Sequence, residues 1–329
     1  MLVRITCSMK NVLKCTALTV GATVGVGFVS GLEWQMFVGD NIPVFVAVFA
    51  IANCLFACVS SQYRADTPQK LCACLFGKYA ALPVWLLTLS NALTVVALLS
   101  ASSEVLHGIL PQAAPLVYAV AVCLVAALLT RINSNKCAVV SAVVSACAIG
   151  CMLLPLTTNG TSEPSSDVKP ILTIAYALFD VTMLSGVTTR TACNNTVRQN
   201  IVYSLLSAMI LGAMLYLPCK IGCLGELHNP LLALLPLLFV TYLLSASTSV
   251  YANAAAPLVA LDELTKDRSL SAYLLFTFAT ALSLFGVQHI MKFAYIAVAC
   301  VGLMLFGAML VKILYKQSKQ AQMPILTTK

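Results

Sequence analysis

Charged residues are scarce in this chain of 329 residues, where they make up only 9% of the sequence. A soluble domain carries about 25% charged residues. Hydrophobic residues account for 60% of the chain, and the mean hydropathy is +0.94. This composition excludes a soluble globular protein and predicts an all-α polytopic membrane protein with many spanning helices.

Histidine is scarce too: His107, His228 and His289 are all expected at the outer ends of helices. The chain has no HExxH zinc motif, no GxSxG nucleophile turn and no Walker glycine loop. It has no CxxC pair with a matching His or Cys partner, and most cysteines are scattered in apolar runs, where they act as small hydrophobic side chains. Cys219 and Cys223 flank an outer loop, either as a disulfide or as two free thiols. We therefore expect no catalytic residues, no enzyme activity, no cofactor and no metal site built from His and Cys.

Apolar runs of about twenty residues, the length that crosses a bilayer, recur along the whole chain. They predict about ten transmembrane helices. We place these helices at 12–38 (broken near 25–28), 41–61, 80–107, 114–130, 137–156, 169–189, 199–219, 231–260, 270–287 and 290–315.

The Lys and Arg residues are distributed unevenly around these helices. With the N-terminus in the cytoplasm, all of the 19 except Lys169, Lys220 and Lys292 fall on the inner side, as the positive-inside rule requires. The net charge of +8 is then explained by membrane orientation, so we expect a lipid bilayer as partner and no nucleic acid. We expect a multi-pass protein integral to the plasma (inner) membrane, with both termini cytoplasmic. Asn159 lies in an outer glycosylation triplet, either a true acceptor or a chance match.

A polar stretch near the middle of the chain separates five predicted helices from the next five. We expect a single membrane transporter domain over 1–329: a first repeat at 1–156, an outer loop at 157–168, a second repeat at 169–316 and a cytoplasmic tail at 317–329. An odd number of spans per half places the halves in opposite orientations. This is the arrangement of inverted-repeat transporters, in which the first and sixth helices are both broken.

The first predicted helix contains the run Gly-Ala-Thr-Val-Gly-Val-Gly-Phe-Val-Ser-Gly over 21–31. Each of Gly25, Gly27 and Gly31 costs a helix interior roughly 1 kcal/mol relative to Ala. In lipid, backbone that leaves a helix must be satisfied again or must line a polar cavity. The run is therefore either a close-packing seam or one half of a binding site.

Three acidic residues are candidates for function. Asp180 falls at mid-membrane depth in the sixth helix, either as a functional carboxylate or as an acid satisfied by neighbouring N–H groups. Glu104 shares a helix face with Ser100 and His107 near an outer end, so this face is either solvated or part of the transport pathway. Glu33 follows the glycine run and is either an outer-gate residue or an interfacial acid.

The eighth predicted helix carries a cluster of hydroxyls at Ser245, Thr248 and Ser249, with Asn253 one turn further on. Such a cluster often bonds back to its own carbonyls or joins neighbouring helices. Facing unwound backbone carbonyls, however, it supplies the oxygen ligands that a hard cation such as sodium needs without adding charge.

Residues 21–33 resemble the first helix, G-x-x-x-G-A-G-F-A-S-G-x-E, of YkvI-like bacterial membrane proteins. These are poorly characterised members of the amino acid–polyamine–organocation superfamily with a LeuT-type fold. The resemblance is specific over 19–37. It is looser at 175–187, at Thr248-Ser249 with Asn253, and at 282–286 followed by Tyr295 and Gly302.

The resemblance implies a sodium ion and a substrate beside the two broken helices. The implied sodium ligands are the carbonyls of Gly21, Val24 and Ser245 and the hydroxyls of Thr248 and Ser249. The implied substrate contacts are Ala22, the N–H groups of Gly25, Val26 and Gly27, and the side chains of Ser100, Phe179 and Asp180. The family usually has Asn at the position of Asp180 and often an acid at the position of Ser245. The class of substrate is therefore left open, because Asp180 either pairs with a cationic amine or couples transport to protons.

We accordingly expect a secondary active transporter that symports sodium with an amino acid or small amine by alternating access. One alternative is a proton-coupled transporter of amino acids or organocations that uses Asp180 or Glu104. Others are a channel and a membrane sensor that kept the fold without transport. The identity of the substrate and the oligomeric state are left open by the sequence.

Overall fold

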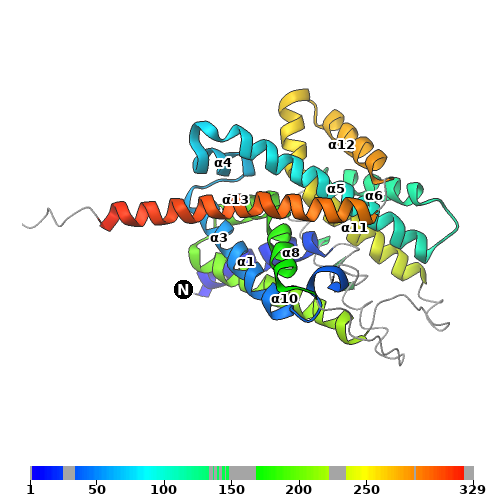
Figure 1. The fold of residues 1–329 in the computed structure, drawn as a ribbon, viewed down its shortest axis with the longest axis horizontal. Helices are drawn as coiled ribbons and strands as arrows, with labels where there is room; N and C mark the ends of the chain where they lie inside the picture. The colour runs from blue at the N-terminus through cyan, green and yellow to red at the C-terminus, as the bar shows by residue number, and fades with distance from the viewer. Residues whose placement is uncertain are drawn as a thin grey trace, which may run out of the picture.

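The computed structural model describes residues 2–24, 34–132, isolated positions between 136 and 147, and residues 168–221, 235–284 and 287–321. Every regular element within these residues is helical (Figure 1). The elements are α1 (Leu2–Thr23), the π-helix η1 (Trp34–Val38), α3 (Ile42–Gln62), α4 (Pro68–Phe76), the 3-10 helix η2 (Gly77–Tyr79), α5 (Ala81–Ile109), α6 (Pro115–Leu129), α8 (Pro170–Met183), α9 (Ser185–Ala192), α10 (Val197–Ile221), α11 (Leu235–Thr265), α12 (Arg268–Ser283) and α13 (Val287–Ala321).

Local chemistry explains where several helices begin. Proline lies in the first turn of α3, α4, α6 and α8, where its missing N–H costs nothing. Thr67 caps α4 by accepting a hydrogen bond from the backbone N–H of Lys70. Asp267 caps α12 in the same way, 2.8 Å from the N–H of Ser269.

Most predicted helices lie where the structure places a helix. The ranges 41–61, 80–107, 114–130, 199–219 and 270–287 correspond to α3, α5, α6, α10 and α12, with small shifts at their ends. The ranges 231–260 and 290–315 correspond to α11 and α13, both of which are longer than predicted. The predicted helix at 137–156 lies largely outside the described residues. The short helix α4 was not predicted.

The long apolar helices make this a multi-pass membrane protein. Four helical segments among the described residues are long and apolar enough to cross a bilayer: Ile42–Gln62, Ala81–Ile109, Val197–Tyr216 and Tyr295–Tyr315. The bent pair α8 and α9 makes a fifth if it is a single span. On α13, the exposed side chains of Ile296, Leu303 and Leu310 recur every seven residues, which gives the helix an apolar outer face. The predicted total of ten spans in two inverted halves stays a prediction.

Two of the predicted spans differ from one continuous helix within the described residues. The regular helix α1 ends at Thr23, two residues before the expected break, and helical backbone is described again from Trp34. The axes of α8 and α9 differ by 57° across Leu184, whose ψ angle of −2° departs from the helical value.

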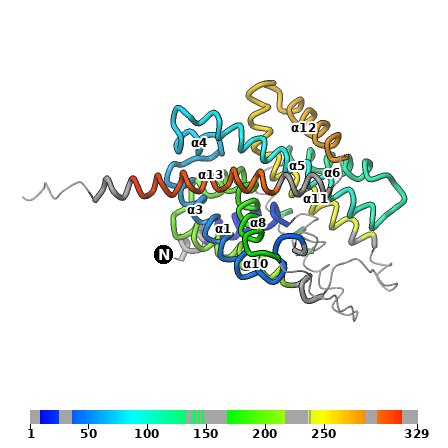
Figure 2. Tube along the Cα trace, in the orientation of Figure 1, coloured from blue at the N-terminus to red at the C-terminus, as the bar shows by residue number. Residues whose placement is uncertain are grey.

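The buried core lies where α5 and α3 pack against the other helices. α5 contacts α11, α13, α6 and α12, while α3 contacts α10 and α8. Figures 1 and 2 show α13 running along the long axis of the molecule, with α4 and α12 on one side of it in this view and α10 on the other. The core thus joins α1, α8 and α11, the elements that carry the predicted site residues, into one packed cluster.

Candidate functional site

The end of α1 presents buried backbone carbonyls. The last carbonyls of an α-helix have no partner within their own helix, so another group must satisfy them. Here they belong to Gly21, Ala22 and Val24, and the side chains of Ala22 and Val24 are buried. The C-terminal end of a helix also carries partial negative charge, which favours a cation nearby.

Three hydroxyls of α11 meet these carbonyls. Ser245, Thr248 and Ser249 share one face of α11 because they are spaced three and four residues apart. Ser245 Oγ donates to Val24 O at 2.6 Å, and Ser249 Oγ donates to Ala22 O. All three side chains are buried.

Thr248 is shared between the two helices. Its Oγ1 lies 2.9 Å from Ser245 O on its own helix and 3.5 Å from Gly21 O on α1. The structure therefore brings together all five residues predicted to bind sodium. We refer to these residues, together with Ala22, as the α1–α11 junction.

Ser247 shows that not every hydroxyl of α11 faces α1. It is as buried as its neighbours, but its Oγ bonds at 2.7 Å to Leu243 O of its own helix. Only the hydroxyls on one face of α11 therefore contact α1, although serine also occurs on other faces of this helix.

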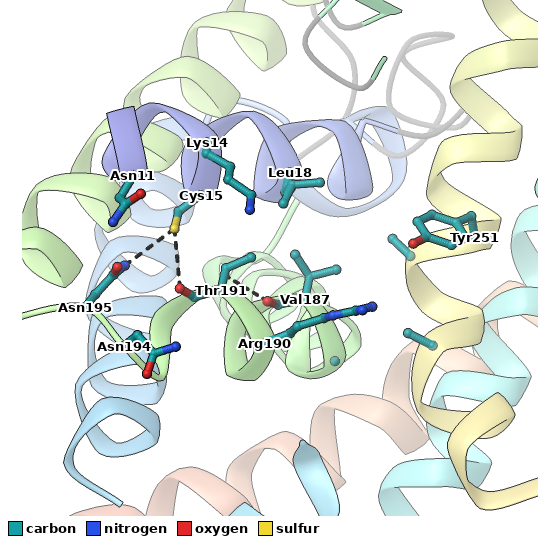
Figure 3. Close-up of a pocket in the computed structure, with 13 residues that line it drawn as sticks. Asn11, Lys14, Cys15, Leu18, Val187, Arg190, Thr191, Asn194, Asn195 and Tyr251 are labelled. Carbon is teal, nitrogen blue, oxygen red and sulfur yellow. Dashed lines mark hydrogen bonds between the residues drawn. The ribbon is translucent and has the colours of Figure 1, made fainter. Parts of the chain in front are cut away.

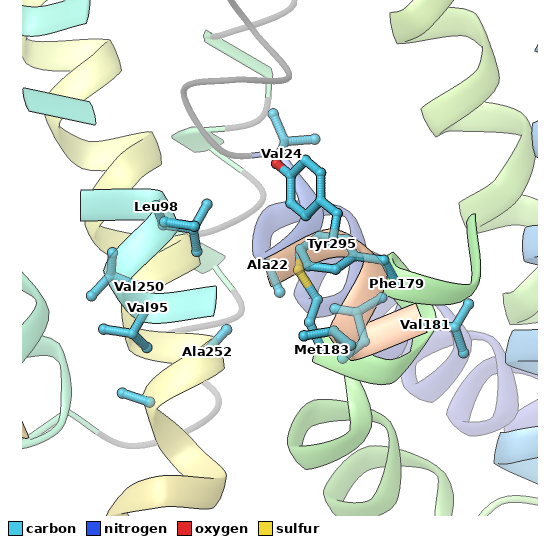
Figure 4. Packing of buried hydrophobic residues seen from close by; sticks show 14 of the residues in the cluster. Ala22, Val24, Val95, Leu98, Phe179, Val181, Met183, Val250, Ala252 and Tyr295 are labelled. Atoms are coloured by element: carbon cyan, nitrogen blue, oxygen red, sulfur yellow. The ribbon is translucent and has the colours of Figure 1, made fainter. Parts of the chain in front are cut away.

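Phe179 and Asp180 lie on the last turn of α8, just before the bend. Phe179 packs edge-on against Tyr295 of α13 with ring centroids 4.0 Å apart, and Tyr176 stacks beside it. Figure 4 shows Phe179 and Tyr295 in the same buried cluster as Ala22 and Val24. Asp180 is only 2% exposed, so a carboxylate is held inside the helical core.

The remaining predicted site residues lie elsewhere or outside the described part of the chain. Ser100 Oγ donates at 2.9 Å to Ser283 O, so this hydroxyl joins α5 to the end of α12. Glu104 is exposed near the C-terminal end of α5, and its role as a solvated residue or as part of a pathway stays a prediction. The predicted residues Gly25, Val26, Gly27 and Glu33 lie outside the described residues.

Sequence reasoning missed two polar features. The first is a buried network around Asn53 of α3, whose side chain bonds to Ser204 and Tyr203 of α10 and to Thr188 of α9. The second is a cavity lined by both Lys14 of α1 and Arg190 of α9. Asn53 could have been found as a polar residue inside an apolar run. No local sequence signal pairs Lys14 with Arg190.

No protein-family model matches this chain, and no curated protein is significantly similar to it. The class of protein is therefore defined by the described fold alone: an all-helical, multi-pass membrane protein with a polar junction inside its core.

Proposed function

We propose that this protein is a secondary active transporter that couples sodium to an amino acid or small amine by alternating access. The observation that carries the proposal is the meeting of three α11 hydroxyls with the carbonyls that end α1. These oxygens are uncharged, hard and buried, and such groups suit a monovalent cation that must bind and leave again.

The chemistry of the junction allows two occupancy states. Without a cation, each hydroxyl proton satisfies a carbonyl, as Ser245 does for Val24. With a cation, a hydroxyl turns its proton away and offers a lone pair, so carbonyl and hydroxyl oxygens become ligands together. A purely structural junction would need only the first state.

The two interrupted helices support the same proposal. Inverted-repeat transporters bind substrate and ion where discontinuous helices expose their backbone at mid-membrane depth. The end of α1 at Thr23 and the 57° bend after α8 fit the breaks expected in the first and sixth of ten helices. The resemblance of residues 21–33 to YkvI-like proteins points to the same five-plus-five fold, with both termini in the cytoplasm.

The substrate would lie between the end of α1 and the bend of α8. Asp180 would pair with an amino group, because a buried carboxylate is stabilised by a nearby positive charge. Phe179 and Tyr295 would pack against the hydrocarbon part of the solute.

The test is thermal unfolding of the purified protein, with sodium replaced by choline at constant ionic strength and with a panel of amino acids and polyamines. A ligand present at a hundredfold excess over its Kd adds about 2.7 kcal/mol of stability. We expect stabilisation by one solute that needs sodium, and we expect Thr248→Ala to abolish this dependence.

Ser247→Ala is the matched control, because Ser247 lies beside Thr248 but bonds only to its own helix. It should keep the full sodium response. A protein that shows no response to any solute or to sodium, or one in which both variants behave alike, would count against sodium coupling.

The burial of Asp180 favours one second candidate, proton-coupled transport. A carboxylate at 2% exposure can carry a proton across the membrane interior if it titrates during the cycle. Solute uptake into vesicles would then follow an imposed pH gradient without sodium, and Asp180→Asn would remove this dependence. In the sodium mechanism a pH gradient alone drives no uptake.

A further inference from the structure

A cavity of about 220 Å³ opens between α1, α9 and α11 (Figure 3). Asn11, Arg190 and Asn194 in its lining are exposed and mark its mouth, whereas Cys15 and Ala252 in its lining are buried. The other lining residues are Lys14, Leu18, Gly186, Val187, Thr191, Asn195, Tyr251 and Ala255.

The charged side chains that line this cavity are all positive. It contains the cations Lys14 and Arg190 but no Asp or Glu, and no described residue forms a salt bridge with Arg190. Three amide side chains and Thr191 also line the cavity and supply uncharged hydrogen-bond groups. Like charges that face one partly enclosed space raise its potential, because the protein walls screen less than water does.

The cavity ends close to the α1–α11 junction. Leu18 lies three residues before Gly21 on α1, and Ala252 lies four residues after Thr248 on α11. Four residues of helix rise by about 6 Å, so about one turn separates these two lining residues from the junction. At Gly186, α9 lies close to α11: a Cβ added at this glycine would contact Ala255 Cβ at 3.4 Å.

We propose that this cavity is a binding site for a small oxyanion, a carboxylate or phosphate group. Arg190 presents a planar fork of N–H donors that matches two oxygens of such a group, and Lys14 adds a second positive charge. Asn194 and Asn195 supply neutral N–H donors that orient it. The cavity favours an anion, whereas the junction favours a cation, and anion binding in the cavity does not depend on sodium binding at the junction.

The oxyanion has two possible sources with the same chemistry. It is either the carboxylate of the solute on its way between the junction and the cavity mouth, or a separate small anion such as inorganic phosphate. Only the first source rests on the proposed transport function.

The test measures thermal unfolding of the full chain in detergent with inorganic phosphate or acetate, against choline chloride at the same ionic strength. We expect the unfolding temperature to be higher in phosphate or acetate than in choline chloride. Arg190→Gln and Lys14→Gln should each weaken the apparent affinity roughly tenfold, as loss of a charged hydrogen-bond partner does. Arg268→Gln removes an exposed cation at the start of α12, outside the cavity, and should change nothing.

Cys15 supplies a second readout that survives if a charge variant folds poorly. Cys15 is a buried free cysteine that lines the cavity. A negatively charged thiol reagent should modify Cys15 faster than a positively charged reagent of the same size, and phosphate should slow both reactions. Peptide mass spectrometry locates the modified cysteine, and Cys15→Ser is the control.

The outcomes separate this inference from the proposed function. Thr248→Ala should keep the phosphate and acetate response even though it loses the sodium response. If a sodium-dependent solute binds about tenfold more weakly to Arg190→Gln, the oxyanion is the carboxylate of that solute. If only phosphate binds more weakly to this variant, the oxyanion is a separate anion. The inference is wrong if neither anion raises the unfolding temperature above its value in choline chloride. It is also wrong if Arg190→Gln and Arg268→Gln show the same response to the anions.

Discussion

Gly302 on α13 allows two helices to pack closely because it has no side chain. A Cβ at this position would stand 2.2 Å from Thr182 Oγ1 and 3.2 Å from Leu178 O on α8. We therefore expect Gly302→Ala to lower the free energy of unfolding by about 1–3 kcal/mol, because the packed helices must move apart. Denaturant or thermal unfolding in detergent measures this change.

Gly307 is the matched control for Gly302. It lies on the same helix, and a Cβ added there meets nothing within 4 Å. Gly307→Ala should be neutral or stabilising, since Ala favours a helix by roughly 1 kcal/mol over Gly. Adding Thr182→Ala to Gly302→Ala should recover part of the loss, because it removes the atom that clashes first. Equal effects of the two glycine substitutions would show that α8 and α13 do not pack this closely.

Single residues of the α1–α11 junction could be predicted because their signals are local. Glycines weaken the end of the first helix, and hydroxyls spaced by three and four residues mark one face of α11. The acceptor of Ser249 was not predicted, because it is the backbone carbonyl of Ala22 and every residue has one. Lys14 and Arg190 were interpreted only as orientation charges, since 176 residues separate them and only the fold brings them to one cavity.

At the scale of elements, the Asn53 network joins α3, α9 and α10. Tyr203 donates to Asn53 Oδ1 at 3.1 Å, and Asn53 Nδ2 lies 3.3 Å from Ser204 Oγ. We expect Tyr203→Phe to cost about 1 kcal/mol and Asn53→Leu to cost more, because the second change leaves several buried groups unsatisfied. The free energy of unfolding in detergent is again the measurement.

The double variant separates hydrogen bonding from packing in this network. Tyr203→Phe added to Asn53→Leu removes the phenol hydroxyl that Asn53→Leu left without its partner. The combined cost should therefore be less than the sum of the two single costs. Tyr273→Phe on the exposed face of α12 is the control and should have no effect. Additive costs would mean that Asn53 and Tyr203 do not interact.

The limits of prediction differ between elements. Long apolar runs predicted α3, α5 and α10, which are long enough to cross a bilayer, and the shorter apolar helix α6. The helix α4 was missed, because nine residues are too few for an apolar period to stand out. Its signal was the pair Thr67 and Pro68, a cap followed by a first-turn proline. The break in the sixth helix was expected from the inverted repeat, and its position at Leu184 is marked by the pair Ser185 and Gly186 that follows, since helices kink at such pairs.

At the scale of the whole molecule, the charge distribution makes the orientation testable. All but three of the 19 Lys and Arg residues fall on one predicted side of the membrane, which the positive-inside rule assigns to the cytoplasm. Fusions of a fluorescent protein at Ala65, Arg131, Asn195 and Lys266 should therefore be fluorescent, and a phosphatase fused at Gln112 should be active outside. The C-terminal fusion should be fluorescent as well.

The pair of fusions at Arg131 and Asn195 is the most informative, because the part of the chain between them contains the predicted fifth helix, the outer loop and the bent pair α8 and α9. Two crossings return the chain to the side it left, so both fusions must report the cytoplasm. If they report opposite sides, the number of crossings between them is odd. The two halves would then have the same orientation, or the bent pair would not be a span, and either result removes the inverted repeat on which the proposed transport mechanism rests.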